Sequence, residues 1–219
     1  MSVDLVVFDM AGTTVLDDGL VERAFRRALP DAGEEQVRYV RDTMGQSKIV
    51  VFRALLGEET LAQRANAAFE VAYAELVAEG HCAPVPGAVE VITDLRARGV
   101  KVAFGTGFSR ATQQVILSAL GWTELADFTT TPAEAGRGRP YPDMVLAAVL
   151  GLGLTDVRSV AVVGDTPSDV LSGLRAGARV VAGVLTGASS PEDLAAAGAT
   201  HVLASVRDLP AVLDLPERP

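Results

Sequence analysis

Short apolar runs rich in β-branched residues recur along the chain and alternate with longer stretches of helical period. Such runs are typical of buried strands, and their alternation with amphipathic helices is typical of a parallel sheet covered on both faces. We therefore predict an α/β protein with a doubly wound, Rossmann-like parallel sheet. The expected strands are Leu5–Phe8, Lys101–Gly105, Asp127–Thr129, Ser159–Val163 and Arg179–Val184, with a weaker sixth at His201–Leu203. The expected helices of this core are Ala88–Arg98, Arg110–Leu120, Pro142–Leu150 and Ser168–Ala176.

Residues 18–83 interrupt the alternation, because they have helical period and no convincing strand. Their expected helices are Val21–Leu29, Glu34–Asp42, Ser47–Leu56 and Thr60–Ala78. We expect a small all-helical cap domain at 18–83, inserted after the first strand of a core domain that comprises 1–17 and 84–219. An insert at this point would cover the carboxyl ends of the strands, where it can exclude water and add a residue to a site. The alternative is that these helices only extend the core.

Carboxylates follow two of the expected strands. Asp9 comes directly after the first strand, Asp165 follows the fourth, and Asp169 lies in the first turn of the next helix. Because ligands of an open α/β sheet gather at the carboxyl ends of its strands, we expect the three side chains to converge. Carboxylate oxygens are hard ligands that suit Mg²⁺ and leave room for water and a substrate phosphate. Asp169 has a simpler alternative, as a first-turn residue favoured by the helix dipole.

An anionic substrate beside three carboxylates also requires hydrogen-bond donors and a cation. Thr106 follows the second strand and offers a hydroxyl with backbone N–H groups close by, as many phosphate sites do. Arg139 lies in a turn rich in Gly and Pro just before a helix. A guanidinium fixed in that turn could stabilise charge on a transferred group and offset the repulsion between carboxylates.

With Asp9, Thr106, Arg139, Asp165 and Asp169 in this order, and a helical insert after the first of them, the chain resembles the haloacid dehalogenase superfamily over nearly its whole length. The resemblance implies Mg²⁺ as cofactor and Asp9 as a nucleophile that forms an aspartyl-phosphate. It also implies that Thr106 binds phosphate and that Arg139 takes the place of the usual lysine. Asp165 and Asp169 would be the acids of the metal site.

The closest resemblance within the superfamily is to its phosphonatase (phosphonoacetaldehyde hydrolase) branch. The stretches that carry it are 9–14, 44–48, 138–142 and 164–166, with Ala11 and Arg139 as the most specific positions. The resemblance makes the backbone carbonyl of Ala11 a further metal ligand beside Asp9, Asp165 and Asp169. The residues expected to contact the substrate or its phosphoryl group are Ala11, Gly12, Thr13, Met44 and Gly107.

Ala11 stands where most phosphatases of this superfamily carry a second carboxylate, which serves as general acid for an alkoxide leaving group. A broken carbon–phosphorus bond leaves a carbanion, and a carboxylic acid does little to stabilise this leaving group. The resemblance implies that Lys48 of the cap condenses with a substrate aldehyde and that its iminium accepts the electrons. A lysine can do so only if burial or nearby positive charge lowers its pKa. The alternative is a solvated cap lysine.

The chain departs from the phosphonatase branch at three places. Val51 stands in place of a histidine, Phe108 in place of a tyrosine, and no cysteine lies near Gly19–Leu20. Three interpretations therefore stay open. The first is a hydrolase of a phosphonoacetaldehyde-type phosphonate, and the second is a phosphate monoesterase in which Lys48 only binds the substrate. The third is a binding module that keeps the fold without turnover.

Composition narrows the expected partners and compartment. The net charge of −9 argues against a nucleic-acid surface, and no apolar run approaches the ~18 residues of a membrane span. Cys82 is the only cysteine, so no intrachain disulfide can form, and the first residues lack the pattern of a signal peptide. We expect a cytoplasmic protein whose partner is a small phosphorylated or phosphonate substrate. The resemblance adds a homodimer formed through the cap.

Overall fold

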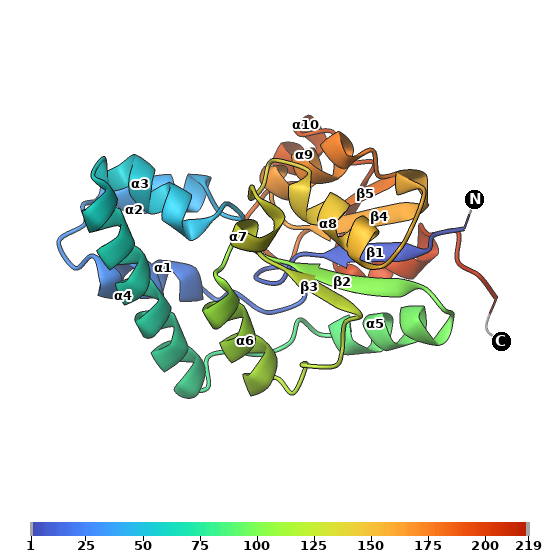
Figure 1. Ribbon diagram of the computed structural model, residues 1–219, viewed down its shortest axis with the longest axis horizontal. Coiled ribbons are helices and arrows are strands. Elements are labelled where there is room, and N and C mark those ends of the chain that lie inside the picture. The colour runs from blue at the N-terminus through green and yellow to red at the C-terminus, as the bar shows by residue number, and fades with distance from the viewer. Residues whose placement is uncertain (1, 218–219) are drawn as a thin grey trace.

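The computed structural model describes residues 2–217 and contains a six-stranded parallel sheet, which confirms the predicted fold class (Figure 1). The strand order is β3-β2-β1-β4-β5-β6, so β1 and β4 lie side by side at the centre. The strands are β1 (Leu5–Phe8), β2 (Lys101–Gly105), β3 (Phe128–Thr130), β4 (Val160–Gly164), β5 (Val180–Val184) and β6 (His201–Leu203).

Helices cover both faces of the sheet. In Figure 1, α5 (Ala88–Ala97) and α6 (Arg110–Ala119) lie below it, whereas α8 (Asp143–Gly151) and α9 (Pro167–Ala176) lie above it. The remaining short helices of this part are α7 (Pro132–Ala135), α10 (Pro191–Ala196) and the 3₁₀ helices at Val157–Ser159 and Val206–Ala211. Among residues 2–217, no helix has the length and apolar character that a membrane crossing requires.

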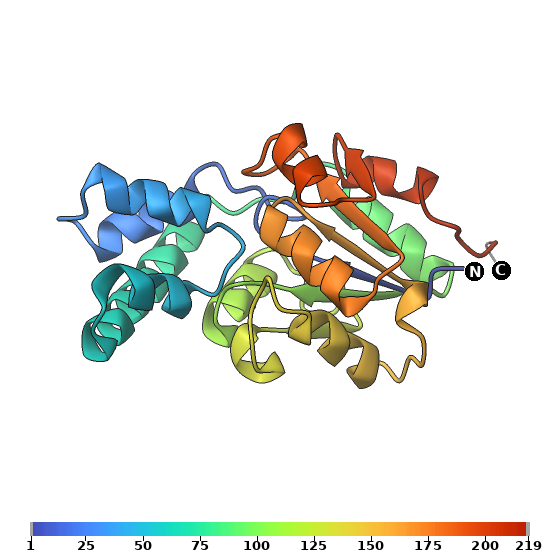
Figure 2. The same cartoon turned by 90° about the horizontal axis from the view of Figure 1, so that it is seen from above.

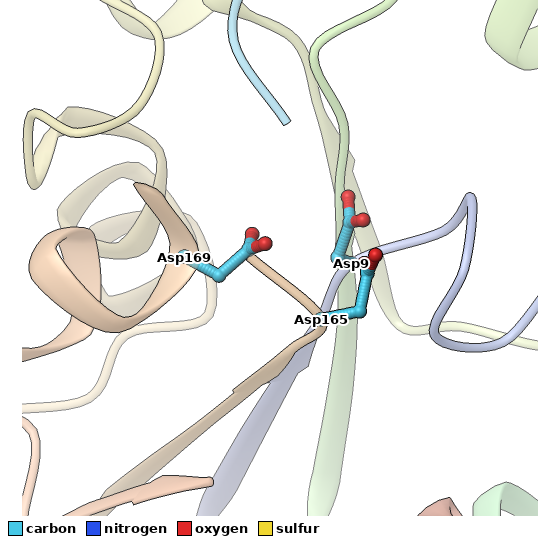
Figure 3. A group of neighbouring side chains, drawn as sticks. All are labelled: Asp9, Asp165 and Asp169. Carbon is cyan, nitrogen blue, oxygen red and sulfur yellow. The ribbon is translucent and has the colours of Figure 1, made fainter. Parts of the chain in front are cut away.

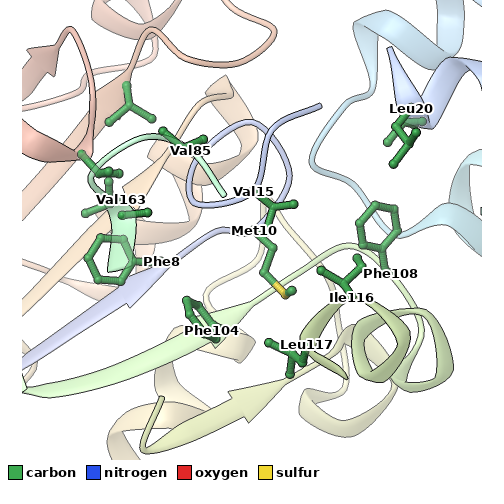
Figure 4. Packing of buried hydrophobic residues seen from close by; sticks show 14 of the residues in the cluster. Phe8, Met10, Val15, Leu20, Val85, Phe104, Phe108, Ile116, Leu117 and Val163 are labelled. Carbon is green, nitrogen blue, oxygen red and sulfur yellow. The ribbon is translucent and has the colours of Figure 1, made fainter. Parts of the chain in front are cut away.

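The central strand β1 is buried on both sides, which explains its continuous apolar sequence. Val6 and Phe8 face the cluster that contains the α5 and α6 side chains, and Leu5 and Val7 face the cluster that contains those of α8. Figure 4 shows Phe8 on the first of these faces, together with Phe104 of β2. A strand held this firmly fixes the position of whatever residue follows it.

Four helices between β1 and α5 form a separate group at the carboxyl ends of the strands (Figures 1 and 2). They are α1 (Leu20–Ala28), α2 (Glu34–Asp42), α3 (Lys48–Leu56) and α4 (Glu59–Ala78), and we call this group the helical cap. Helix α4 packs against α1 and α3, and also against α6. The division into two domains at 17/18 and 83/84 stays a prediction.

An aromatic row joins the helical cap to the core. Ring centroids lie 5.8 Å apart for Phe25 and Phe52, 6.0 Å for Phe52 and Phe69, and 5.8 Å for Phe69 and Tyr73. Tyr73 then packs on Phe108, which follows β2, at 4.8 Å. The helical cap therefore packs against the core through buried aromatic rings.

The observed bounds differ from the predicted ones where local turns compete with strand pairing. Strand β4 begins one residue later than expected, because the side chain of Asp156 accepts a hydrogen bond from the Arg158 N–H and caps a 3₁₀ turn there. Helix α10 was not predicted. The Ser190 hydroxyl accepts a hydrogen bond from the Asp193 N–H to cap it, but six residues are too few to display a helical period.

Candidate active site

Three carboxylates meet at the carboxyl end of the sheet (Figure 3). One oxygen of each of Asp9, Asp165 and Asp169 lies within 4.8 Å of an oxygen of the other two, and all three side chains are buried. Asp9 and Asp165 follow β1 and β4, which pair in parallel with Phe8 opposite Val163. The structure thus brings together the two acids that follow strands and the third in the first turn of the next helix, as the sequence analysis expects.

Asp165 is held from two sides. The Thr13 hydroxyl donates to its Oδ1 at 3.0 Å, and the Ala188 N–H donates to its Oδ2 at 2.9 Å. Gly12 has a φ of +85°, and a Cβ there would lie 2.5 Å from Oδ2 of Asp165, so only glycine allows this approach. Burial and the charge of Asp9 raise the pKa of Asp165 well above its usual range. Gly12 and Thr13 therefore support the carboxylate from outside the cavity.

Asp169 lies in the first turn of α9 and also belongs to the acid cluster. The Thr166 N–H donates to Oδ2 of Asp169 at 3.1 Å, in a capping box that starts α9. Its Oδ1 lies 2.7 Å from Nε of Arg139. Burial raises the pKa of Asp169 to about 6, although the charge of Arg139 opposes the shift. One carboxylate thus caps the helix and joins the acid cluster.

Arg139 is the counter-ion of the cluster. Its Nη1 lies 2.7 Å from Oδ1 of Asp9, and its Nε contacts Asp169. Its Nη2 donates to the Gly105 carbonyl at 2.8 Å, and Nη1 donates to the Gly45 carbonyl of the cap at 3.4 Å. Burial lowers the pKa of Arg139, but the charges of Asp169 and Asp9 outweigh it and leave the pKa raised. The guanidinium therefore stays charged.

The donor set fits a hard divalent cation. Three buried carboxylates face one guanidinium, and among residues 2–217 no cationic side chain pairs with Asp165. Burial and the repulsion between the carboxylates raise the pKa of Asp165 and Asp169, and a cation between them would relieve that repulsion. The ligands available are oxygens alone, as Mg²⁺ prefers.

A small cavity lies over Asp9 between the core and the helical cap. Its volume is about 20 Å³, close to the space of one water molecule, so the cap lies closed over the acids. Of the predicted site residues, those that line it are Asp9, Ala11, Met44, Lys48, Thr106, Gly107, Arg139 and Asp165. Lys48 and Arg139 also border a larger cavity of about 520 Å³ between α3 and the loop before α8. A ligand much larger than a water molecule therefore fits over Asp9 only if the cap moves.

The cap loop touches the core at Gly107. A Cβ on Gly107 would lie 2.4 Å from the Gln46 carbonyl oxygen, and the Lys48 N–H donates to the Gly107 carbonyl at 3.2 Å. Thr106 lies beside this contact, and its hydroxyl accepts a hydrogen bond from the Phe108 N–H at 3.3 Å. Backbone groups of the cap and of the turn after β2 thus meet directly over the acids.

Lys48 brings a buried amine into the site. It is the first residue of α3, 8% exposed, and its Nζ lies 5.5 Å from the centre of the Phe108 ring. Within the described part of the chain, its Nζ has no hydrogen bond or ion pair. Burial lowers the pKa of Lys48, against the charges of Asp17 and Asp9, which raise it. Its place at a helix N-terminus also disfavours the ammonium form.

The sequence analysis did not predict some of the residues that line the cavity or support the acids. Thr166, Gly45 and Val21 line it, and Ala188 supports Asp165 from a loop after β5. Thr166 could have been found from its spacing of three before an acidic residue, which is a capping pattern. The others carry no local signal. Val51, buried one turn after Lys48, does not line the cavity.

A family model described as haloacid dehalogenase-like hydrolase matches residues 3–177. The chain belongs to this hydrolase family. It is 32% identical over 212 residues to phosphonoacetaldehyde hydrolase of Bacillus thuringiensis, with 86% of this chain and 78% of that protein covered. This similarity confirms the prediction that the chain resembles the phosphonatase branch of the family.

The chain is also similar to solved structures of other proteins, of which we describe two. A hydrolase from Pseudomonas syringae has a TM-score of 0.85 at 25% identity, with 98% of each chain covered. A phosphonoacetaldehyde hydrolase-like protein from Oleispira antarctica has a TM-score of 0.80 at 26% identity, with 97% of this chain and 91% of that chain covered. The similarity thus extends over the cap as well as the core.

Proposed function

We propose that the chain is an Mg²⁺-dependent hydrolase of a small phosphonate of the phosphonoacetaldehyde type. The phosphoryl group moves to Asp9 and then to water, while Lys48 holds the rest of the substrate as a Schiff base. The observation that carries this proposal is the buried amine of Lys48, which lines the same closed cavity as Asp9 in a site with alanine at position 11. The relatives named above support the same substrate class.

Asp9 is the group placed to attack phosphorus. It stands at the end of the rigid central strand, and Arg139 fixes one of its oxygens. The Thr106 hydroxyl and the N–H groups of the turn after it would donate to the phosphoryl oxygens. Asp9, Asp165, Asp169 and the Ala11 carbonyl would hold Mg²⁺, which neutralises charge on the transferred group when it is bound.

Lys48 replaces the proton donor that Ala11 lacks. The neutral amine adds to the aldehyde carbon, and the adduct takes up one proton and loses water, which gives a protonated imine. When the carbon–phosphorus bond breaks, phosphorus is taken by Asp9 and the electron pair enters the imine to form an enamine. Protonation of carbon and hydrolysis of the imine then release an aldehyde and restore Lys48, and a second water releases phosphate from Asp9. A cytoplasmic location and a homodimer through the cap stay predictions.

Borohydride trapping tests the proposal, and the chain suits it because Lys48 and Lys101 are its only lysines. With phosphonoacetaldehyde and borohydride, we expect a reduced adduct on the peptide that contains Lys48. Lys48→Ala should lose both the adduct and phosphate release. Lys101→Ala, which changes an exposed lysine on the core, is the matched control and should keep both.

The second candidate is a phosphate monoesterase in which Lys48 only binds substrate. Val51 and Phe108 favour it, because the phosphonatase branch places a histidine and a tyrosine at these positions. Robust ester hydrolysis by Lys48→Ala, with no adduct in the unmodified chain, would replace the first proposal with this one. Failure to release phosphate from any of a panel of phosphonates and esters, with Mg²⁺ present, would instead indicate a binding module.

A further inference from the structure

The larger cavity beside the acid cluster has more room than the proposed substrate requires. Its volume is about 520 Å³, and it shares four wall residues with the small cavity over Asp9, namely Lys48, Gly107, Phe108 and Arg139. Pockets of roughly 300–1,000 Å³ take ligands of many atoms, whereas phosphonoacetaldehyde has a chain of only two carbons. The larger cavity can therefore take a longer carbon part of a substrate whose phosphoryl group lies over Asp9.

The wall of the larger cavity carries positive charge. Among the described residues that border it, none is acidic and four are cationic, namely Lys48, Arg53, Arg137 and Arg139. The whole chain has the opposite balance, with 28 acidic residues against 19 lysines and arginines. A cavity lined by one sign of charge raises the local concentration of ions of the other sign. Arg139 already pairs with the acid cluster, so Arg53 and Arg137 are the arginines left for an anionic ligand.

Arg53 and Arg137 are each held by one carboxylate that does not border the cavity. Glu59 accepts hydrogen bonds from Nε and Nη2 of Arg53, both at 2.7 Å. Asp143 accepts from Nε and Nη2 of Arg137, at 2.6 and 2.8 Å. In both guanidiniums Nη1 has no hydrogen-bond partner among residues 2–217. The carboxylates weaken the positive charge, but they fix each guanidinium in place with one donor nitrogen left for a ligand, so little side-chain freedom is lost on binding.

Ser47 adds a hydroxyl to the same wall. It is the N-cap residue of α3 and is 7% exposed, yet its side chain makes no capping hydrogen bond. Ser109, the N-cap residue of α6, also borders the cavity and accepts the usual hydrogen bond from the Thr112 N–H. A serine that does not cap its helix gives up the stability that capping provides. Within the described part of the chain the Ser47 hydroxyl has no hydrogen-bond partner, so it is a second polar group left for a ligand.

We propose that the larger cavity binds a carboxylate on the carbon part of the substrate, to which Nη1 of Arg53, Nη1 of Arg137 and the Ser47 hydroxyl donate. Hydrogen bonds from a guanidinium to a carboxylate are about twice as strong as those between neutral groups. The inference deepens the proposed function and rests on it for the placement of the phosphoryl group over Asp9. The substrate class is then a phosphonate with a carbonyl group close to phosphorus, for Lys48, and a carboxylate further along the carbon chain.

Two series of inert phosphonates test this site by calorimetry in the presence of Mg²⁺. The first runs from 3-phosphonopropanoate to 6-phosphonohexanoate, and the second contains the alkylphosphonates with the same numbers of carbons. Neither series has an aldehyde or ketone for Lys48, so binding is measured apart from turnover. At the chain length that spans the two cavities, we expect the Kd of the carboxylate compound to be about 10-fold lower than that of its alkyl partner.

The ratio of the two Kd values is then measured in variants. Arg53→Met and Arg137→Met in one chain should bring this ratio to about 1, and Ser47→Ala should lower it about threefold. Arg158→Met is the matched control and should keep the ratio. Arg158 also pairs with a nearby acid, Asp156, through Nε and Nη2, but it lies at the amino end of β4, away from the site. Because all three arginines are in exposed pairs, the variants should fold.

Failure of the inference and failure of the proposed function give different results. If the two series bind equally at every length, or if the double variant keeps the preference, the carboxylate site is wrong, and the Lys48 adduct with phosphonoacetaldehyde still decides the proposed function. If the unmodified chain prefers the carboxylate series but forms no adduct, the Schiff base is wrong and the carboxylate site stands for a phosphate ester. If no phosphonate of either series binds, the phosphoryl site over Asp9 is wrong and the inference falls with it.

Discussion

Replacement of Arg139 by methionine tests how the acid cluster is held together without a metal ion. The side chain is 6% exposed and lies 2.7 Å from a carboxylate oxygen of Asp9 and 2.7 Å from one of Asp169. Methionine keeps much of the apolar volume and removes the charge. The change therefore leaves two buried carboxylates without their counter-ion and removes one hydrogen-bond donor from each of two backbone carbonyls.

Removing one partner of a buried ion pair costs about 3–5 kcal/mol. In a chain of this length, 1 kcal/mol corresponds to about 2–4 °C in Tm, so Arg139→Met should lower Tm by about 6–20 °C in EDTA at neutral pH. Saturating Mg²⁺ should restore part of this loss, because the cation supplies the missing positive charge. Unfolding followed by calorimetry, with EDTA and with Mg²⁺, measures both effects.

Arg137→Met is the matched control, because Arg137 lies two residues earlier and pairs with Asp143 through an exposed guanidinium. An exposed pair of this kind contributes about 0–1 kcal/mol. If Arg139→Met is as stable in EDTA as Arg137→Met, the carboxylates do not depend on Arg139 and the electrostatic description of the cluster is wrong.

Three further predictions concern the acid cluster, the cap contact and the single thiol. The pKa of Asp169 is raised from its ordinary value of 3.8 to about 6 in the folded chain. Without metal, its contribution to the free energy of unfolding is therefore fully present below pH 3.8 and is lost as the pH rises through about 6. The rise in Tm on adding Mg²⁺ should therefore be larger at about pH 7.5 than at about pH 5, and an equal rise would contradict the role of Asp169. Gly107→Ala places a Cβ against the Gln46 carbonyl and should weaken cap closure, seen as faster proteolysis of the cap, whereas Gly33→Ala, with no atom near its Cβ, should not. Burial raises the pKa of Cys82 to about 11, so alkylation by iodoacetamide at about pH 8 should be about 100-fold slower than for a small thiol, and equal rates would show that the thiol is not buried.

The core was predictable because each of its elements carries its own pattern. β1 and β2 have the predicted bounds, since strands buried on both faces read as unbroken apolar runs. The convergence of Asp9 with Asp165 followed from one rule, that parallel strands end at the same edge. Family resemblance added Lys48, which no local pattern would place in a site.

Other parts of the site depend on contacts that no local sequence reveals. Ala188 donates to Asp165 across 23 positions, and Tyr73 reaches the cavity wall only because α4 packs on α6. The absence of a hydrogen-bond partner for the Tyr73 hydroxyl among the described residues is visible only in the folded chain, because the sequence of α4 is that of an ordinary amphipathic helix. Asp169 was ambiguous for another reason: helix capping and membership of the acid cluster favour the same residue at the same position.

The central claim is that Asp9 receives the phosphoryl group in a cluster of carboxylates that holds Mg²⁺. The most direct test is to mix the chain with phosphonoacetaldehyde and Mg²⁺, quench with acid within one turnover, and map the peptides by mass spectrometry. We predict one phosphoryl group on the peptide that contains Asp9, with none in EDTA or in Asp9→Asn. Release of phosphate with no phosphorylated peptide, or with the phosphoryl group on another residue, would contradict the account.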